Sequence, residues 1–209
     1  MSPRTSKQFE GIREEKRNLI MDTALEHFAN QGYYATTINH IAKHAGISKG
    51  LMYNYFESKE ALLEAILQKS VIEIYKYLDI DEDGSLSEAE FEFFVRKISV
   101  VLYEKKSFWR LFFQLLMQNE VRENFSVLSS DPLIKMEFFN DNKNFTQVIS
   151  GMIADYFMRK KSGKGPEYDP LLDMNLFIIT LKGYAITRIY IDDEKEDESI
   201  VNQIIKLFK

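Results

Sequence analysis

Residues 36–67 read TTINHIAKHAGISKGLMYNYFESKEALLEAIL, and this stretch decides the fold. Its apolar residues recur at helical spacing, and the short segment HAGIS interrupts them. Gly46 tolerates the left-handed backbone that a tight turn needs, because it has no Cβ. Ser48 is a residue type that caps the start of the next helix. The stretch therefore predicts two short helices, Thr37–Ala45 and Ser48–Tyr55, joined by a glycine turn.

Two short helices joined in this way form a helix-turn-helix, whose second helix lies in the major groove of DNA while the first crosses the backbone. Either Thr36 or Thr37 is expected to cap the first helix. In the second helix, Lys49 and Asn54 can bond to base edges, and Gly50 allows a close approach to DNA. The residues expected in the domain's core are Ile38, Ile41, Ala42, Ile47, Met52 and Phe56. Tyr53 fits either the core or a DNA contact.

The rest of the chain repeats the helical spacing, and no run alternates with the period of a strand. Gly32 is expected to stop the helix before the motif, which buries Leu19, Ile20, Ala24, Leu25 and Phe28. The other predicted helices cover residues 14–31, 59–78, 88–106, 107–125, 133–161, 171–191 and 199–209. The fold class is therefore all-α with about nine helices, and the charged run 192–198 is expected to be a connection.

Several motifs in the first third of the chain resemble those of the TetR/AcrR family of transcriptional regulators, over about residues 16–67. The matching segments are Ala24…Phe28…Gly32-Tyr33, Thr37-Ile38…Ile41-Ala42, Ala45-Gly46-Ile47-Ser48 and Tyr53-Asn54-Tyr55-Phe56-Glu57-Ser58-Lys59-Glu60-Ala61-Leu62. The resemblance implies a helix-turn-helix domain over residues 1–60 and a helical effector-binding and dimerisation domain over 61–209. It also implies a homodimer that leaves a palindromic operator when a small effector binds.

The resemblance also assigns DNA contacts by position. Thr37, Tyr53, Tyr55 and Lys59 would meet phosphates. The residues that would face the groove are Ser48, Lys49, Gly50, Leu51 and Asn54. The full set of expected contacts is Thr37, Ser48, Lys49, Gly50, Leu51, Tyr53, Asn54, Tyr55 and Lys59.

Composition neither supports nor opposes DNA binding. The net charge of the 209 residues is −5, but residues 1–60 hold 8 Lys and Arg against 7 Asp and Glu. A local basic face is compatible with DNA binding by an acidic protein. The chain has no cysteine, which excludes disulfides and thiolate metal sites, and it shows no apolar run of membrane-spanning length or secretory signal. A cytoplasmic protein is therefore expected.

The segment DIDEDGSLSEAE, residues 79–90, has the spacing of an EF-hand calcium loop. The expected ligands are Asp79, Asp81, Asp83, Ser85 and Glu90, with Ser87 acting through water. Gly84 stands at the sharp turn, and Leu86 is the apolar eighth residue.

Three interpretations of this loop stay open. It binds calcium and regulates DNA binding, it binds calcium only to stiffen the joint between the domains, or it is an acidic helix connection. Asp and Ser cap helices, Glu suits a helix N-terminus, and EF-hands usually occur in pairs, all of which favour the connection. Carboxylates crowded into twelve residues repel one another without a cation or solvent, which favours the metal.

Residues 100–190 contain most of the bulky side chains, which suits a pocket between helices for an apolar or aromatic effector. These residues are Tyr103, Phe108, Trp109, Phe112, Phe113, Met117, Phe125, Met136, Phe138, Phe139, Phe145, Met152, Tyr156, Phe157, Met174, Phe177 and Tyr184. Most are equally explained as core, so no effector contact is assigned. The last two helices, about 171–192 and 198–208, are expected to form a four-helix bundle with a second copy.

An enzyme is the competing class of function. The sequence shows no Ser-His-Asp arrangement, and its glycines do not form a Rossmann or P-loop motif. Its three histidines, His27, His40 and His44, lack metal-ligand spacing, and His40 and His44 are expected at the surface. The sequence thus favours a ligand-responsive repressor that is not an enzyme, with a calcium-responsive regulator as the alternative.

Overall fold

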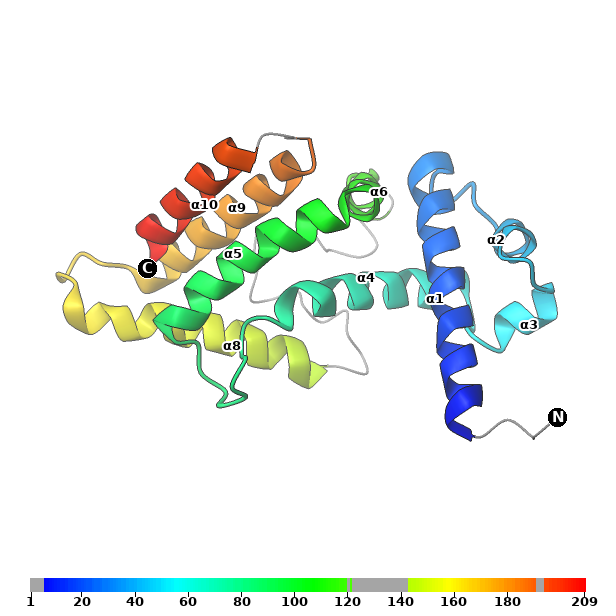
Figure 1. Cartoon of the computed structure of the whole chain (residues 1–209), viewed down its shortest axis with the longest axis horizontal. Helices are drawn as coiled ribbons and strands as arrows, with labels where there is room; N and C mark the ends of the chain where they lie inside the picture. The colour runs from blue at the N-terminus through cyan, green and yellow to red at the C-terminus, as the bar shows by residue number, and fades with distance from the viewer. Residues whose placement is uncertain (1–5, 120, 122–142, 191–193) are drawn as a thin grey trace.

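The computed structural model describes residues 6–119, 121, 143–190 and 194–209, and all regular elements in these ranges are helices. Figure 1 shows an elongated molecule with its first three helices at one end and a helical bundle at the other. The all-α fold class is confirmed. The helices are α1 (Ser6–Gln31), α2 (Ile38–His44), α3 (Lys49–Tyr53), α4 (Lys59–Tyr75), α5 (Glu88–Glu104), α6 (Lys106–Leu116), α8 (Lys143–Arg159), the 3₁₀ turn η1 (Lys160–Gly163), α9 (Pro170–Arg188) and α10 (Glu194–Phe208).

Helix α1 is longer than the apolar pattern predicts. It begins at Ser6, and the described side chains of its first turns are exposed, so no buried stripe marks this part in the sequence. The expected stripe is confirmed at four positions, but Leu19 is 45% exposed and was wrongly placed in the core. Gly32 ends the helix with φ +90, in the left-handed region that glycine favours.

Helix α4 joins the two ends of the molecule. It begins in the first domain, where Ser58 caps it by accepting a hydrogen bond from the Ala61 N–H, and it runs toward the bundle (Figure 1). It ends at Tyr75, three residues earlier than the predicted end at residue 78. The acidic segment 79–90 then leads into α5.

The bundle core is built from aromatic side chains of α5, α8, α9 and α10. The Phe91 ring stacks on Tyr156 with centroids 4.7 Å apart and lies 5.0 Å from the Phe177 ring. Phe208 closes the cluster, with its centroid 5.4 Å from that of Phe177. Burying such large apolar side chains is the main stabilising term of the bundle.

Two predicted boundaries of the second domain are wrong. Helix α6 ends at Leu116 rather than continuing to residue 125, and residues 133–142 of the expected helix 133–161 lie outside the described part. The charged run 192–198 is not simply a connection, since α10 begins at Glu194.

Asp197 is 5% exposed and accepts a hydrogen bond from the Tyr184 hydroxyl (2.7 Å). Its carboxylate also lies 2.8 Å from Arg188 Nε, so opposite charge compensates its burial.

Within the described ranges, no helix is both long and apolar enough to cross a lipid bilayer.

Candidate nucleic-acid interface and acidic loop

The turn between α2 and α3 forms through local hydrogen bonds. The Thr37 hydroxyl accepts from the His40 N–H (3.2 Å), and the Ser48 hydroxyl accepts from the Leu51 N–H (3.1 Å). Thr37, rather than Thr36, is therefore the cap of α2. Gly46 has φ +66, and the Ile47 N–H donates to the Ala42 carbonyl (3.0 Å). These bonds set the direction in which α3 leaves the turn.

Helix α3 is short and presents most of its residues to solvent. Met52 is fully buried and Phe56 is 4% exposed, so both belong to the core as predicted. Tyr53 is 46% exposed, which excludes the core alternative for its ring. The expected contact residues that are exposed are Thr37, Ser48, Lys49, Gly50, Leu51, Tyr53 and Asn54, and those that are partly buried are Tyr55 and Lys59.

Gly50 is not required for the fold. A Cβ built at this position would meet no atom within 4 Å, and the backbone there lies outside the left-handed region. An alanine would fit and would favour the helix. A glycine at this exposed site therefore keeps the surface of α3 flat without stabilising the domain.

Lys59 has a structural role that the sequence did not reveal. Its ammonium donates to the Tyr33 carbonyl (2.9 Å) and to the Thr36 carbonyl (3.1 Å), and it lies 4.4 Å from the Tyr33 ring centroid. It thus holds the connection between α1 and α2 against the start of α4. The expected phosphate contact of Lys59 stays a prediction.

The histidines do not form a metal cluster in the described residues. His40 and His44 are exposed, as predicted. His27 is 7% exposed, and its Nε2 contacts Nδ1 of His44 while the two rings stack with centroids 4.5 Å apart. This contact joins α1 to α2, so His27 and His44 have a structural role in packing the two helices together.

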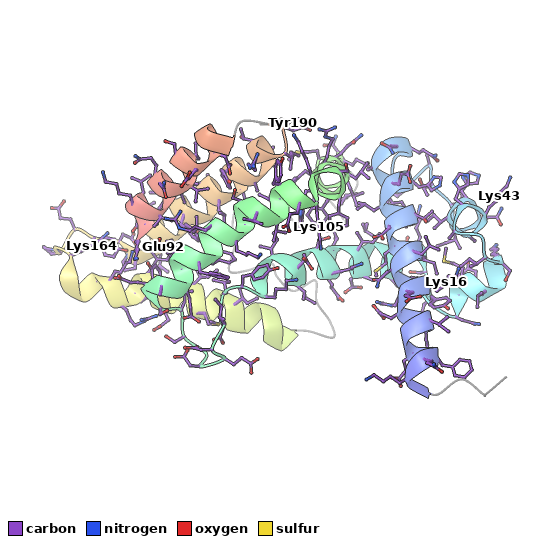
Figure 2. The ribbon with its side chains drawn as sticks, in the orientation of Figure 1. Lys16, Lys43, Glu92, Lys105, Lys164 and Tyr190 are labelled. Carbon is purple, nitrogen blue, oxygen red and sulfur yellow. The ribbon has the colours of Figure 1, made fainter. Side chains whose placement is uncertain are left out.

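Basic side chains lie at the helix-turn-helix end of the molecule. Figure 2 places Lys16 on α1 and Lys43 on α2, far from Glu92 and Lys164 on the bundle. Lys43 and Lys49 are exposed and have no carboxylate within 4.0 Å in the described part of the chain. Cations without an internal partner suit a surface that meets phosphates.

Comparisons with known proteins agree with this geometry. Residues 20–66 match the family model described as bacterial regulatory proteins, tetR family. These residues are a TetR-family DNA-binding segment.

Two curated relatives and one solved structure define the extent of the likeness. The HTH-type transcriptional regulator YuxN of Bacillus subtilis is 41% identical over 92 residues, 44% of this chain but only 30% of YuxN. RutR of Escherichia coli O157:H7 is 29% identical over 194 residues, 91% of this chain and 81% of RutR. FadR of Bacillus subtilis, solved in complex with stearoyl-CoA, has a TM-score of 0.63 at 20% identity, covering 91% of this chain and 96% of FadR. All three of these proteins are described as transcriptional regulators.

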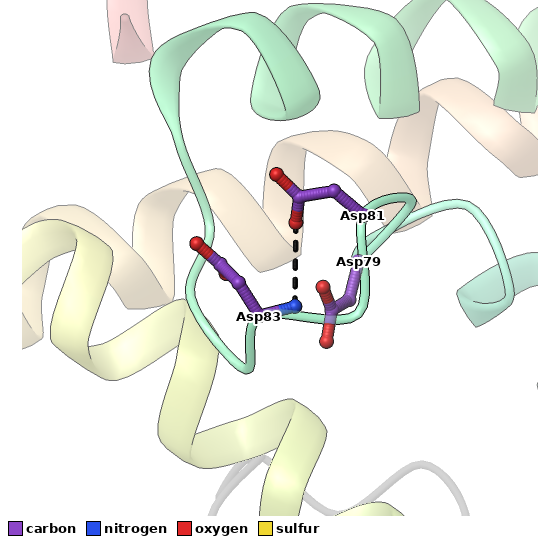
Figure 3. A group of neighbouring side chains, drawn as sticks. All are labelled: Asp79, Asp81 and Asp83. Carbon is purple, nitrogen blue, oxygen red and sulfur yellow. Dashed lines mark hydrogen bonds between the residues drawn. The ribbon is translucent and has the colours of Figure 1, made fainter.

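The acidic loop folds around its own carboxylates. One carboxylate oxygen each from Asp79, Asp81 and Asp83 lies within 4.8 Å of the others (Figure 3). The Asp83 N–H donates to Asp81 (3.3 Å), and the Gly84 N–H, at φ +77, donates to Asp79 Oδ2 (3.1 Å). The other oxygen of Asp79, Oδ1, is buried without a hydrogen-bond partner among the described residues.

Glu90 does not join this group. Its carboxylate accepts from the Ile80 N–H (3.0 Å), the Ser87 N–H (3.0 Å) and the Ser87 hydroxyl (2.7 Å), while the Ser87 hydroxyl accepts from the Glu90 N–H. This is a capping box at the start of α5. Burial on its own would raise the pKa of Glu90, but these hydrogen bonds outweigh burial and hold the pKa below its usual range.

The loop is fastened to the bundle without a second EF-hand. Leu86 is 1% exposed, and its carbonyl accepts from Arg159 of α8 (2.7 Å). Ser85 donates its N–H to Asp83 Oδ1 (2.7 Å). The buried Leu86 side chain and the bond from Arg159 to its carbonyl therefore hold the loop against the bundle.

The bulky residues of the second domain divide into three sets. Those that are buried are Trp109, Phe112, Met152, Tyr156, Phe157, Met174, Phe177 and Tyr184; Phe108 and Phe113 are partly buried, and Tyr103 and Met117 are exposed. Phe125, Met136, Phe138 and Phe139 lie outside the described residues, as does the side chain of Phe145. No single effector contact follows from this distribution.

Tyr33 and Gln118 are the residues that sequence reasoning missed. Tyr33 is 3% exposed, and it donates its N–H to Gln118 Oε1 (2.9 Å) and its hydroxyl to Glu60 Oε1 (3.1 Å). Only the glycine-aromatic pair Gly32-Tyr33 pointed to this position, and no local pattern marks Gln118.

Proposed function

We propose that the protein is a sequence-specific DNA-binding transcriptional regulator that binds its operator through α3. The observation that carries this proposal is a capped helix whose buried face is Met52 while its other residues are exposed. The unpaired Lys49 and the sterically free Gly50 lie together on that surface. The likeness to TetR-family regulators supports it.

The proposed roles follow from the position of each side chain. Lys49 and Asn54 bond to base edges, Gly50 lets the helix approach closely, and Leu51, 39% exposed, touches a thymine methyl. Ser48 combines its cap with a phosphate contact at the N-terminus of α3. Thr37, Tyr53, Tyr55 and Lys59 contact phosphates and set the register.

A homodimer on a palindromic operator is the proposed assembly. Leu172, Leu176 and Ile179 recur at helical spacing on α9 and are 56%, 47% and 66% exposed, while Met174 and Phe177 of the same helix are buried. A helix that is apolar on both faces calls for a second partner surface. Residues 1–60 would act as the DNA-binding domain and residues 61–209 as the effector-binding and dimerisation domain.

Repression relieved by a small apolar or aromatic effector is the proposed mode of control, and the cytoplasm is the proposed compartment. The aromatic content of the helical domain supports an apolar ligand. The solved complex of FadR with stearoyl-CoA shows that a protein of this fold holds a ligand with a long apolar chain.

In vitro selection from random duplexes, followed by titration of the recovered sequence, tests the DNA-binding proposal. We expect a palindromic sequence to be enriched and its affinity to fall steeply as salt rises, because phosphate contacts release counterions. Failure to enrich any sequence, or a flat plot of log affinity against log salt, would reject it.

Calcium-responsive regulation is the second candidate, and the convergence of Asp79, Asp81 and Asp83 favours it. The buried, unpartnered oxygen of Asp79 offers a free lone pair to a hard cation. Ser85 and Glu90 would complete the ligand set after Glu90 exchanges its capping-box bonds for the metal. A site that only stiffens the joint between the domains would use the same ligands.

Calorimetric titration of chelator-stripped protein tests this candidate. We expect one site per chain with an affinity on the order of micromolar. The Asp79→Ala/Glu90→Ala variant should lose it, while Asp22→Ala, which removes an exposed carboxylate on α1, should keep it. If calcium produces no heat and no change in melting temperature, the segment does not bind calcium and is an acidic capped turn. If calcium binds, operator titration with and without calcium separates regulation from stiffening.

A further inference from the structure

Tyr33 is bonded through all three of its polar groups to other parts of the chain. Its N–H donates to Gln118 at the end of α6, its carbonyl accepts from Lys59, and its hydroxyl donates to Glu60. Its ring meets the Phe28 ring edge-on with centroids 5.1 Å apart. This residue lies in the six-residue connection between α1 and α2, so its position sets where the helix-turn-helix begins.

Gln118 uses both ends of its amide at this connection. Its Oε1 accepts from the Tyr33 N–H (2.9 Å), and its Nε2 donates to the Phe28 carbonyl in the last turn of α1 (2.6 Å). The side chain is partly buried, and it is 85 residues from Tyr33 in the sequence. A side-chain amide can accept from an N–H through its oxygen and donate to a C=O through its nitrogen at the same time.

These bonds connect Tyr33 to two helices, α4 and α6. Helix α4 reaches Tyr33 through Lys59 and Glu60, which begin that helix. Helix α6 leads into Gln118, whose amide bonds to the Tyr33 N–H. Figure 1 shows α6 between α1 and α5, at the junction of the two ends of the molecule.

We propose that Gln118 is a positioning residue for DNA binding, and that its amide fixes the helix-turn-helix in its DNA-competent orientation by clamping the connection between α1 and α2. A displacement of α6 would break both bonds and release the Tyr33 N–H from Gln118, while the bonds of Tyr33 to Lys59 and Glu60 and the contacts of α3 stay intact. The DNA part of this inference rests on the proposed function.

The first test is independent of DNA. Gln118→Met keeps the length of the side chain and removes both hydrogen bonds, and Gln114→Met makes the same change at an exposed glutamine one turn earlier on α6. Hydrogen exchange should become about ten-fold or more faster at the Tyr33 amide in Gln118→Met, because local opening no longer breaks that bond. Exchange in α9 should stay unchanged in both variants.

The second test uses the duplex that wild-type protein selects from a random pool. Gln118→Met should bind it about five- to twenty-fold more weakly with an unchanged slope against log salt, because no phosphate contact is lost. Gln114→Met should bind like wild type. Gln118→Glu retains the acceptor for the Tyr33 N–H but loses the amide donor, so its affinity should fall between the two.

The outcomes separate this inference from the proposed function. If wild-type protein selects no DNA, the proposed function fails, and the exchange rate at Tyr33 still decides whether the clamp exists. Unchanged exchange at Tyr33 in Gln118→Met overturns the clamp. Faster local exchange with unchanged operator affinity overturns the positioning role. Faster exchange throughout the chain with a lower melting temperature would show that Gln118 only stabilises the fold.

Discussion

The turn before α3 and the turn before α5 use the same devices. In the first, Gly46 has φ +66, Ile47 is partly buried and Ser48 caps the helix. In the second, residues 84–87 repeat this order, with Gly84 at φ +77, Leu86 buried and Ser87 as the cap. Glycine, an apolar plug and a serine cap are what any tight entry into a helix needs.

The two turns differ in the polar groups that folding leaves without an internal partner. At α3, the exposed cation Lys49 has no carboxylate partner among the described residues. Next to it stands Gly50, where the backbone does not require a glycine. Around the acidic loop, one carboxylate oxygen each from Asp79, Asp81 and Asp83 converges with the others, and Asp79 Oδ1 is buried without a hydrogen-bond partner among the described residues. Such groups are the best candidates for function, because no contact within the fold explains why they are there.

Removing the cation should produce the largest change. Lys49→Ala should weaken operator binding more than about ten-fold, the size expected when one bidentate base contact is lost. The melting temperature should not change, because Lys49 is exposed and unpaired. Fluorescence anisotropy with the selected duplex measures the effect. Lys206→Ala on α10 is the matched control, and equal affinity of both variants would remove α3 from the interface.

Filling the surface of α3 should have the next largest effect. Gly50→Ala should leave the stability equal or raise it by about 0.5–1 kcal/mol, because alanine favours a helix. Operator affinity should nevertheless fall about five-fold, because the added methyl group separates the helix from the groove. Gly151→Ala, also at an exposed helical site with open space for a Cβ, should give the same gain without changing affinity. Undiminished binding by Gly50→Ala would contradict close approach.

The two caps allow a direct comparison of stability. Ser48→Ala and Ser87→Ala should each destabilise the protein by about 1 kcal/mol. Ser87→Ala should cost more, because the Ser87 hydroxyl also donates to Glu90, which would be left with fewer bonds. Chemical denaturation measures both changes, and only Ser48→Ala should also weaken DNA binding. If Ser48→Ala lowers the free energy of unfolding more than Ser87→Ala does, the additional role assigned to the Ser87 hydroxyl is wrong.

The smallest expected effect is a dependence on pH. The pKa of Glu90 is lower in the folded protein than its ordinary value, so the ionised group stabilises the fold above the ordinary glutamate pKa. That contribution should be lost as the pH falls through the lowered pKa. Glu90→Gln should remove this part of the acid dependence, which melting temperatures across mildly acidic pH measure. If the melting temperature of Glu90→Gln falls with decreasing pH as it does in the wild type, other carboxylates cause the loss of stability.

The helix-turn-helix was predictable because it depends on neighbours in sequence. Caps, glycine turns and the burial of Met52 follow from residues within one or two helical turns. The EF-hand spacing was recognisable for the same reason, and the structure brings its three aspartates together. It does not bring Glu90 to them, because the nearer Ser87 and Ile80 groups bind that carboxylate first.

Errors arose where the partner of a side chain is distant in sequence. Leu19 fits the apolar stripe of α1, but no helix covers it, and it is exposed. Asp197 looks like part of a solvated charged run, yet Arg188 and Tyr184 bury it. The helical residues 6–13 show no buried apolar stripe in the sequence, and their described side chains are exposed.

The sequence by itself determined the helices, the glycine turns, the caps and the family, because each depends on conformational preferences and hydrogen bonds that act over a few residues. Only the tertiary structure decided what each charged or polar side chain does. Lys59 and Gln118 have ordinary surroundings in the sequence, but both bond to Tyr33, from residues 26 and 85 positions away. The physical reason is that a polar group is solvated or paired according to what packs across from it, and that is settled only when the helices assemble.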